Sequence, residues 1–358
     1  MQLLIGFWVL AALLAACGQP APDVSEVSPA ASSADSTPVE AGTPSASPQK
    51  TYPVKLKHDG GETTIMKEPG RIVVLGDEMA ERALALGIKP VGYGSSRLQS
   101  ASVGSPVVRT SYLDPKLLGQ PKFVGSSLEP SIETILSLKP DLILYLYYDP
   151  KLYESASRIA PTLAFDVGQK GAWQRALKVV GQAVGRQEMA DEIIRDFDAR
   201  RKALRDQLAP VAKSSPQVAV LYLPSPDTTM VFDGRFTLAD IFPDLGFRLT
   251  QPSGVQIGRS GFSEVSAEAL SELDADNIVT IRIKGTEGQR QYQAEEVLLT
   301  LGVPVRTYFI DPERPYTGPY SEPSFMDDFA SLLLGRKASW EQRSEVPRGR
   351  VREAGSPL

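Results

Sequence analysis

The sequence predicts an α/β fold of two pseudo-symmetric lobes with mostly parallel sheets, joined by a single long helix. Three observations predict this fold. Short apolar runs typical of buried strands alternate with amphipathic helical patterns along most of the chain. One helix–strand segment recurs 135 residues further along, and a long helical stretch separates the two halves. The length of 358 residues is enough for about two domains.

The expected strands fall into two groups. Those of the first half lie at residues 71–76, 90–93, 141–146 and 162–165. Helical patterns continue from the first of these strands to Leu86 and occupy 132–138 before the third. After residue 210 the same alternation returns, with expected strands at 217–223, 277–283 and 305–310. Alternation of this kind indicates βα units whose strands lie parallel in a sheet.

The stretch between the two halves, residues 172–208, has helical periodicity. Trp173, Leu177 and Val180 fall on one stripe, and apolar residues continue at similar spacing to Leu208. Gly185 is expected to divide the stretch into two helices. A helix of about 20 residues spans roughly 30 Å, which is long enough to join two lobes.

The repeated segment has the pattern Ser-x-Glu-x-Ile/Leu-x-x-Leu-x-x-Asp-x-Ile. It begins at Ser131 and again at Ser266. Each copy is typical of a Ser N-cap with Glu in the first turn, an amphipathic helix, a tight turn and a buried strand. Two lobes that share this unit predict a pseudo-symmetric molecule, although any two βα units resemble one another to some extent.

The composition argues against several classes of function. A net charge of −5 leaves no basic surface for nucleic acid. A single Cys excludes a disulfide framework, and a single His, His58, argues against a His-rich zinc site and most Ser-His or Cys-His machinery. The chain has no GxxxxGK[ST], HExxH or GxSxG motif. We therefore expect a protein that is not an enzyme and has no cofactor and no metal ligands of its own.

The amino terminus indicates where the protein is found. Residues 3–16 are apolar and uncharged, too short to cross a membrane and typical of a signal peptide. They end in Leu-Ala-Ala before Cys17, which resembles the lipobox of bacterial lipoproteins, in which the Cys becomes the acylated first residue. The alternative is a secretory signal or anchor helix that contains a Cys by coincidence. The expected location is extracytoplasmic, with a lipid anchor in a bacterial membrane.

The remaining boundaries follow from composition. The stretch after Cys17 is rich in Pro, Ser and Ala without an aromatic residue, which is typical of a disordered tether. The expected organisation is a signal peptide at 1–16, the lipidated Cys and tether at 17–52, a first lobe at 53–185, a connecting helix at 186–210, a second lobe at 211–338 and a polar tail at 339–358.

Three stretches together carry a family resemblance. They read VGSSLEPSIETILSLKPDLILY from Val124, YESASRIAPTLAFD from Tyr153 with the helical segment that follows, and SEVSAEALSELDADNIV from Ser263. With the first strand, RIVVLGDEMAERALALGIKPVGY, the chain resembles the substrate-binding proteins of iron-siderophore ABC importers over about 70–335. This group also serves vitamin B12 and haem. The resemblance implies two α/β lobes on one long helix, with a ligand held in the cleft between them.

The resemblance also implies the function and the partners. It implies a monomeric solute-binding lipoprotein that captures a ferric siderophore and delivers it to an ABC permease and its ATPase for iron uptake. A binder of vitamin B12 or haem in the same importer family is one alternative. A lipoprotein that senses or scaffolds without transport is another. In the resembled family one surface Glu on each lobe docks to the permease, and by position these are Glu133 and Glu268, although the helix dipole alone favours a Glu there.

The ligand site is expected in loops at the carboxyl ends of the strands, where open α/β sheets bind ligands. Arg side chains suit anionic oxygens, and aromatic faces cover a ligand with little loss of entropy. The candidates in these loops are Arg109, Tyr148, Trp173, Arg235, Arg259, Arg282, Tyr316 and Tyr320. Each Arg has the alternative role of a surface charge, and Trp173 that of a core residue.

Two further possibilities concern metals. The pair Tyr147-Tyr148 permits direct binding of ferric iron by phenolates if both lie in a loop, because neighbours in a strand point to opposite faces. The scarcity of His favours a metal that arrives already bound by its own ligand. Arg97 and Arg314 lie in the same set of loops as the candidates above, among which Arg235, Arg259 and Arg282 are the first choices. The scarcity of His argues against a zinc or manganese binder.

Overall fold

The structure, a computed structural model, describes residues 52–98, 101–147, 149–235, 237–258, 261–287 and 292–336. They belong to one compact unit, which spans Lys50–Leu358. The expected signal peptide, Cys17, most of the tether and the polar tail lie outside the described residues, as do Tyr148 and Arg259. Within the described part, no helix is both long enough and apolar enough to cross a membrane.

The first lobe is built on a five-stranded parallel sheet of order β5-β4-β3-β6-β7. Its strands are β3 (Ile72–Leu75), β4 (Gly92–Gly94), β5 (Lys122–Phe123), β6 (Leu142–Leu146) and β7 (Thr162–Phe165). The hairpin of β1 (Val54–His58) and β2 (Gly61–Ile65) precedes this sheet. The helices are α1 (Asp77–Ala85), α2 (Pro115–Leu118), α3 (Ile132–Ser137), α4 (Pro150–Ser157) and α5 (Ala172–Ala183). Every residue of β3, β4, β6 and β7 is buried, as expected for a parallel sheet covered on both faces.

The second lobe has a mixed sheet of order β11-β9-β8-β12-β13, with β10 also paired to β8. Its strands are β8 (Gln217–Ser225), β9 (Thr228–Phe232), β10 (Arg248–Thr250), β11 (Phe262–Val265), β12 (Asn277–Ile283) and β13 (Val305–Ile310). Strands β9 and β11 are antiparallel to their neighbours, and the other pairs are parallel. The helices are α7 (Thr237–Asp244), the 3₁₀ helix η1 (Glu268–Glu272), α8 (Gln293–Thr300) and α9 (Ser321–Leu333).

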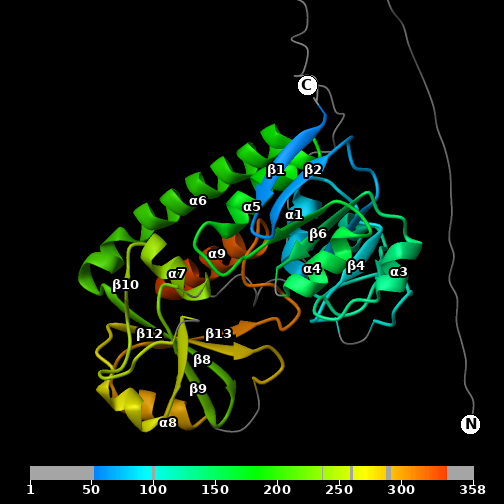
Figure 1. The fold of residues 1–358 in the computed structure, drawn as a ribbon. Coiled ribbons are helices and arrows are strands. Elements are labelled where there is room, and N and C mark those ends of the chain that lie inside the picture. Colours follow the sequence, from blue (N-terminus) through cyan, green and yellow to red (C-terminus); the bar gives the residue numbers. More distant parts are fainter. Residues whose placement is uncertain are drawn as a thin grey trace, which may run out of the picture. The chain divides into compact units, whose positions relative to one another are not determined.

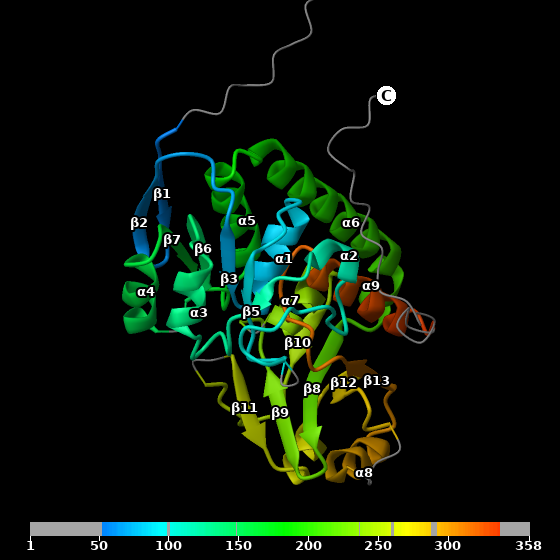
Figure 2. The ribbon, with the colours of Figure 1, turned by 90° about the vertical axis from the view of Figure 1, so that its right-hand side faces the viewer.

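Helix α6 (Gln187–Ser214) links the lobes, packing against α5 of the first and α9 of the second (Figure 1). The predicted break at Gly185 is confirmed: α5 ends at Ala183 and α6 begins at Gln187. Gly185 has a φ of 64°, a left-handed conformation that glycine adopts without steric cost. Figure 2 shows the same helix turned by 90°, running from beside α5 toward α9. The predicted α/β class with a long linking helix is therefore confirmed.

The hydrophobic core does not divide where the lobes divide. One buried cluster runs from first-lobe residues such as Val74 and Met79, through Phe197 and Leu204 of α6, to Phe329 of α9. A second cluster is confined to the second lobe, and a third, which contains Val73 and Ile143, to the first. The helices at the junction therefore share one core, whereas the outer faces of the two sheets have cores of their own.

The repeated segment forms the same junction in both lobes. In the first, the Asp141 carboxylate accepts hydrogen bonds from the backbone N–H groups of Gly70 (2.9 Å) and Arg71 (2.7 Å), just before β3. In the second, Asp276 accepts one from the N–H of Gln217, at the start of β8 (2.8 Å). The expected helix of the second copy is instead the 3₁₀ helix η1, in which each N–H bonds three residues back rather than four.

A candidate ligand cleft between the lobes

The first lobe brings a short, tightly packed turn to the junction. Strand β3 ends at Leu75 and α1 begins at Asp77, with only Gly76 between them. Gly76 has a φ of 119°, and a Cβ added there would lie 2.7 Å from Cβ of Leu146. Only glycine fits this turn, and it places the first turn of α1, with Asp77 and Glu78, in buried positions.

Asp77 is the centre of a hydrogen-bond network at the carboxyl ends of β3 and β4. The hydroxyl of Tyr93 donates to Oδ1, and that of Ser95 donates to both carboxylate oxygens at 2.8 and 2.9 Å. Burial, with Glu78 next to it, raises the pKa of Asp77 to about 7, and the two hydroxyl donors and Arg97 act against that rise. The network fixes a carboxyl group directly behind the Arg97 side chain.

Arg97 projects from this network toward the second lobe. Its Nε lies 3.7 Å from Oδ2 of Asp77, and its Nη2 lies 3.6 Å from Oε1 of Glu78. Its guanidinium carbon lies 4.7 Å from the centre of the Tyr316 ring, within cation–π distance. Burial acts to lower the pKa of Arg97, but Glu78, Tyr316 and Asp77 outweigh it and raise the pKa above the usual range. The Arg97 side chain is therefore fixed at the junction by these contacts and remains positively charged.

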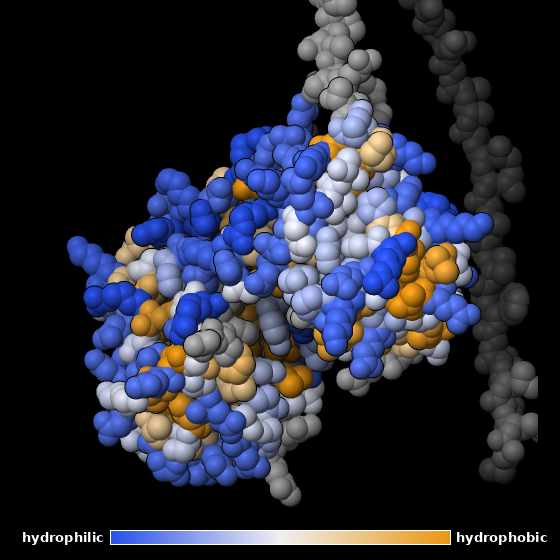
Figure 3. All heavy atoms as spheres, viewed as in Figure 1, coloured by the Kyte–Doolittle hydropathy of each residue, from blue (hydrophilic) through white to orange (hydrophobic). Residues whose placement is uncertain are grey.

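The second lobe contributes aromatic side chains opposite this charge. Tyr316 follows β13, and its hydroxyl neighbours Tyr222 on β8. Burial, followed by the effect of Tyr316, raises the pKa of Tyr222 to about 12. Figure 3 shows the surface hollowed between the two lobes, with hydrophobic residues along the hollow. The first lobe therefore contributes the cation of Arg97 to one wall of the cleft, and the second lobe contributes the phenol rings of Tyr222 and Tyr316 to the facing wall.

Exposed polar contacts cross the junction next to Arg97. The backbone N–H of Ser111 donates to Oε2 of Glu313, and its hydroxyl donates to Oδ1 of Asp311, both at 2.7 Å. Arg109, a predicted ligand contact, lies two residues before Ser111 and is exposed.

Two predicted ligand contacts lie in the interior instead. Trp173 is 1% exposed and packs edge-on against Phe197, with ring centres 5.0 Å apart, so it has the alternative role of a core residue. Arg282 is buried at the end of β12, where its Nη1 bonds to Oε1 of Glu295 at 3.0 Å and its guanidinium covers the Tyr292 ring at 3.9 Å. A buried charge in a strand is costly unless it is paired, and Arg282 is paired.

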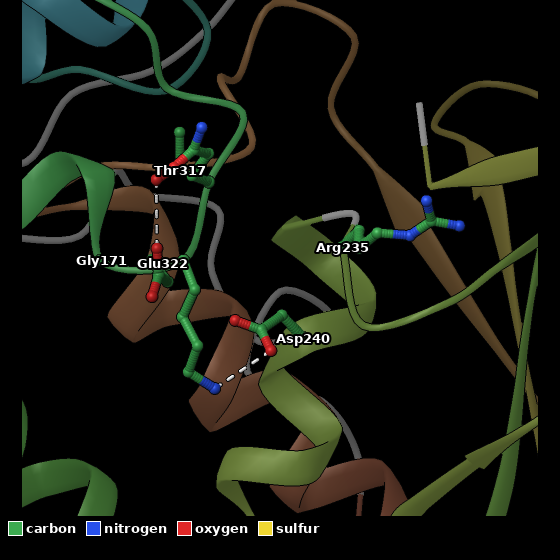
Figure 4. A pocket seen from close by; sticks show the side chains of 7 residues that line it. Gly171, Arg235, Asp240, Thr317 and Glu322 are labelled. Carbon is green, nitrogen blue, oxygen red and sulfur yellow. Dashed lines mark hydrogen bonds and ion pairs between the residues drawn. The ribbon is translucent and has the colours of Figure 1, made fainter. Parts of the chain in front are cut away.

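Two other predicted ligand contacts, Arg235 and Tyr320, lie at different places in the second lobe. Arg235 is exposed and donates to the Asp233 carboxylate through Nε at 2.8 Å. It borders a small polar pocket with Lys170, Asp240, Thr317 and Glu322, but its side chain points away from the other polar groups (Figure 4). Lys170 bonds to Asp240 at 3.0 Å within that pocket. Tyr320 is partly buried in the shared core.

Tyr147, the described member of the tyrosine pair, and His58, the single His, each have other contacts in the structure. Tyr147 lies in an aromatic cluster, 6.2 Å from Tyr145 and 6.1 Å from Tyr153 between ring centres. His58 bonds through Nε2 to the Thr63 hydroxyl (2.9 Å), and Nδ1 accepts from the N–H of Gly60 (3.2 Å). Over the described ranges, no group of three or more His, Cys, Asp or Glu side chains is placed to hold a metal ion.

The two candidate docking residues are exposed, one on each lobe. Glu133 lies in the first turn of α3, and Glu268 begins η1. The backbone N–H of Glu268 and the Ser266 hydroxyl hold the pKa of the Glu268 carboxyl below its usual range. In the first lobe, Ile132 and Leu136 are exposed one turn apart on α3, the helix of Glu133, and Leu128 is exposed in the loop before it.

Sequence reasoning placed Arg97 among the loop residues but not among the chosen ligand contacts, and it did not select Asp77 or Tyr222. The available signal was position, because Asp77 and Arg97 directly follow the ends of two adjacent parallel strands. What the sequence lacked was the pairing of these strands and the depth at which Asp77 lies.

The comparisons with known proteins identify the family. The family model "Periplasmic binding protein" matches residues 72–301, and the chain belongs to this family. Because the family consists of binding proteins, the prediction that the chain is not an enzyme is confirmed.

Curated relatives match over the same region. The "Probable siderophore-binding lipoprotein YfiY" of Bacillus subtilis (strain 168) is 34% identical over 227 residues, which are 62% of this chain and 66% of that protein, just under two thirds. The "Achromobactin-binding periplasmic protein" of Dickeya dadantii (strain 3937) is 30% identical over 230 residues, 63% of this chain and 72% of that protein.

Solved structures match the fold more completely. SirA of Staphylococcus aureus, in a crystal structure with staphyloferrin B, has a TM-score of 0.62 at 24% identity. The match covers 79% of this chain and 98% of SirA. FeuA of Bacillus subtilis, complexed with ferri-bacillibactin, has a TM-score of 0.61 at 20% identity and covers 79% of this chain and 99% of FeuA. At these identities the likeness shows the shared fold.

Proposed function

We propose that this protein captures a ferric siderophore complex between its lobes and delivers it to an ABC permease for iron uptake. The observation that carries the proposal is the position of Arg97, which is held by Asp77 and Glu78 and faces Tyr316 of the other lobe. The name of YfiY, a probable siderophore-binding lipoprotein, supports the same class of ligand.

The chemistry of the two walls suits such a ligand. A ferric siderophore is rich in oxygen, often anionic and often edged by apolar or aromatic groups. Arg97 provides fixed donors for anionic oxygens, and the phenol rings of Tyr222 and Tyr316 provide flat surfaces for the ligand body. Iron then arrives already coordinated, so such a site needs no protein ligand for the metal.

A fluorescence titration tests the ligand. The chain has three Trp residues, and ferric complexes that bind near them quench their emission. We expect quenching by at least one ferric complex among hydroxamates, catecholates and hydroxycarboxylates, and none by cobalamin or haem at matched absorbance. Saturable quenching by cobalamin or haem alone would replace the siderophore with one of those ligands, and no response to any ferric complex would contradict the proposal.

The contribution of Arg97 is tested in the same assay. Replacing a charged donor that faces an anionic ligand weakens binding by about tenfold or more, so we expect this loss in Arg97→Ala. The matched control is Arg158→Ala, since Arg158 is an exposed residue at the end of α4. Equal affinities of the two variants, with both folded by circular dichroism, would remove Arg97 from the site.

We also propose that Glu133 and Glu268 dock to the permease. The exposed Ile132 and Leu136, which lie one turn apart on the helix that carries Glu133, support this role, because exposed apolar residues that lie together mark interaction surfaces. In a strain that depends on this protein for iron, the double variant Glu133→Lys, Glu268→Lys should bind ligand normally and lose uptake. Normal uptake in the double variant would contradict docking through these residues. If the wild-type protein itself supported no uptake, a sensing or scaffolding role would be favoured instead.

Anchoring through Cys17 and the extracytoplasmic location are further parts of the proposal. The lipobox-like sequence before Cys17 and the description of YfiY as a lipoprotein support them. Two acyl chains give stable membrane attachment, whereas one gives only marginal binding. Cys17→Ser should therefore move the protein from the membrane fraction to the soluble fraction and abolish incorporation of labelled palmitate. Unchanged membrane association without label incorporation would indicate an anchor of another kind.

A further inference from the structure

A buried carboxylate of the first lobe holds the start of a helix in the second. Glu81, on α1, is 0% exposed. Its Oε2 accepts hydrogen bonds from the backbone N–H groups of Tyr320 and Ser321, both at 3.0 Å, and its Oε1 accepts one from the Ser321 hydroxyl. The two sides of this contact are separated by about 240 residues of sequence.

Helix α9 has no cap of its own at this end. Its N-cap residue, Tyr320, makes no side-chain hydrogen bond to the helix. The first N–H groups of a helix have no partner within it, and they favour a negative charge. Glu81 therefore takes the place of an N-cap residue for α9, although it belongs to a helix of the other lobe.

The loop before α9 is shaped to admit this carboxylate. Gly318 has a φ of 152°, and a Cβ added there would overlap the carboxyl group of Glu81. Any larger residue would push Glu81 off the helix terminus. The glycine and the glutamate thus form a matched pair across the junction.

Nearby cations offset the cost of burying the charge. Arg82, also 0% exposed, is attracted to Glu78, Glu81 and Glu322. Arg314 donates to the backbone oxygen of Ser321 at 2.8 Å and contributes a second positive charge near Glu81. A buried carboxylate without such partners would be strongly destabilising.

Other polar contacts between the lobes differ from this one in their exposure. The Ser111 bonds to Asp311 and Glu313 are exposed, and so is the pairing of Lys170 with Asp244 (2.6 Å). Exposed pairs contribute little because water competes for the same groups. Breaking the Glu81 contact instead leaves a buried carboxylate, the buried N–H of Ser321 and the partly buried N–H of Tyr320 without partners, which costs much more.

We propose that Glu81 is a fixed pivot between the lobes, so that any opening of the cleft turns about the contact of α1 with α9 and mainly separates the exposed rim. The hydrophobic core that the two lobes share around the same helices also holds them together at this point. This proposal concerns the protein without ligand and does not depend on what the cleft binds.

Double electron–electron resonance on the full chain tests the pivot. Spin labels on Lys151→Cys of α4 and Leu299→Cys of α8, both exposed, report the distance between the lobes, with Cys17→Ser in every variant. With Glu81 intact we expect one narrow distance distribution. Glu81→Ala should widen it about twofold or add a second, longer distance. The control, Glu154→Gln on exposed α4, should leave it unchanged.

Two milder variants keep the test decisive if Glu81→Ala does not fold. Ser321→Ala removes only the hydroxyl donor, and Gly318→Ala displaces the carboxylate while all its donors remain. Both should widen the distribution, Gly318→Ala more than Ser321→Ala. A folded Glu81→Ala with the narrow wild-type distribution would overturn the proposal, and so would unchanged distributions in both milder variants.

Discussion

The two lobes build the same junction from the same residue and surround it with different secondary structure. Asp141 and Asp276 each fix the start of the neighbouring strand, and a Glu lies eight residues before each of them. The helix between is α-helical in the first lobe and a 3₁₀ helix in the second. The repeated sequence thus preserves an anchored strand and an exposed Glu, while the helix that connects them tolerates change.

The two lobes also differ in the strand directions of their sheets and in the residues that they bring to the cleft. The first sheet is parallel and buried throughout its central strands, whereas the second adds antiparallel β9 and β11, with partly exposed residues. The first lobe brings charged groups to the junction, Asp77 and Arg97, and the second brings Tyr222 and Tyr316. One fold repeated twice therefore supplies two chemically different walls.

The largest expected effect is a loss of stability, and it compares glycine substitutions in a closely packed turn of the first lobe and in an open turn of the second. Gly76→Ala meets both a left-handed φ and the side chain of Leu146, so we expect a loss of about 3 kcal/mol or more in the free energy of unfolding. Gly254→Ala also has a positive φ, 77°, but no atom lies within 4 Å of its added Cβ, and about 1 kcal/mol is expected. Urea denaturation measures the free energy of unfolding of both variants. Equal losses would show that the positive φ accounts for the cost and that the contact with Leu146 adds nothing.

A smaller effect concerns pH. Burial raises the pKa of Glu322 to about 7, although the Thr317 hydroxyl donates to it at 3.1 Å. Between pH 4.5 and 7 the unfolded chain loses this proton and the native state keeps it, so the native state binds more protons and stability falls as pH rises through this range. Glu322→Gln should make that fall shallower and raise the free energy of unfolding above pH 7 by roughly 1–3 kcal/mol.

The control for this effect lies in the first lobe. Burial also raises the pKa of Asp77 to about 7, so the fall should not vanish in Glu322→Gln but should shrink further when Asp77→Asn is added. Chemical denaturation at several pH values provides the measurement. Parallel curves for wild type and Glu322→Gln would show that Glu322 titrates normally.

The smallest effect compares the two repeated anchors. The Asp141 carboxylate accepts two backbone hydrogen bonds and that of Asp276 accepts one. At about 1 kcal/mol for each bond, Asp141→Ala should cost about 2 kcal/mol and Asp276→Ala about 1 kcal/mol. Thermal denaturation followed by circular dichroism ranks them, and a larger loss for Asp276→Ala would show that the two junctions are not equivalent in energy.

Much of the fold could be predicted because buried parallel strands are short apolar runs with clear ends. The strands at 141–146, 162–165, 277–283 and 305–310 agree with β6, β7, β12 and β13 within one residue, and Gly185 marks the helix break. The hairpin β1–β2 and the antiparallel strands β9 and β11 were not predicted. Most of their residues are exposed or partly exposed, and this weakens the apolar signal.

The candidate site was harder to predict, since a loop position indicates which sheet edge a residue follows but not where its side chain ends. Arg282 and Trp173 have the residue types of ligand contacts, and the structure packs both inside. Arg97 has the same residue type, and the buried Asp77 behind it holds it at the junction.

By itself, the sequence determined the α/β class, the repeat and the linking helix, because these depend on periodicity and on local turn residues. Only the tertiary structure decided which charges face the cleft and that Glu81 caps a helix of the other lobe. The physical reason is that burial and pairing depend on neighbours about 240 residues away along the chain, and no local pattern encodes those neighbours.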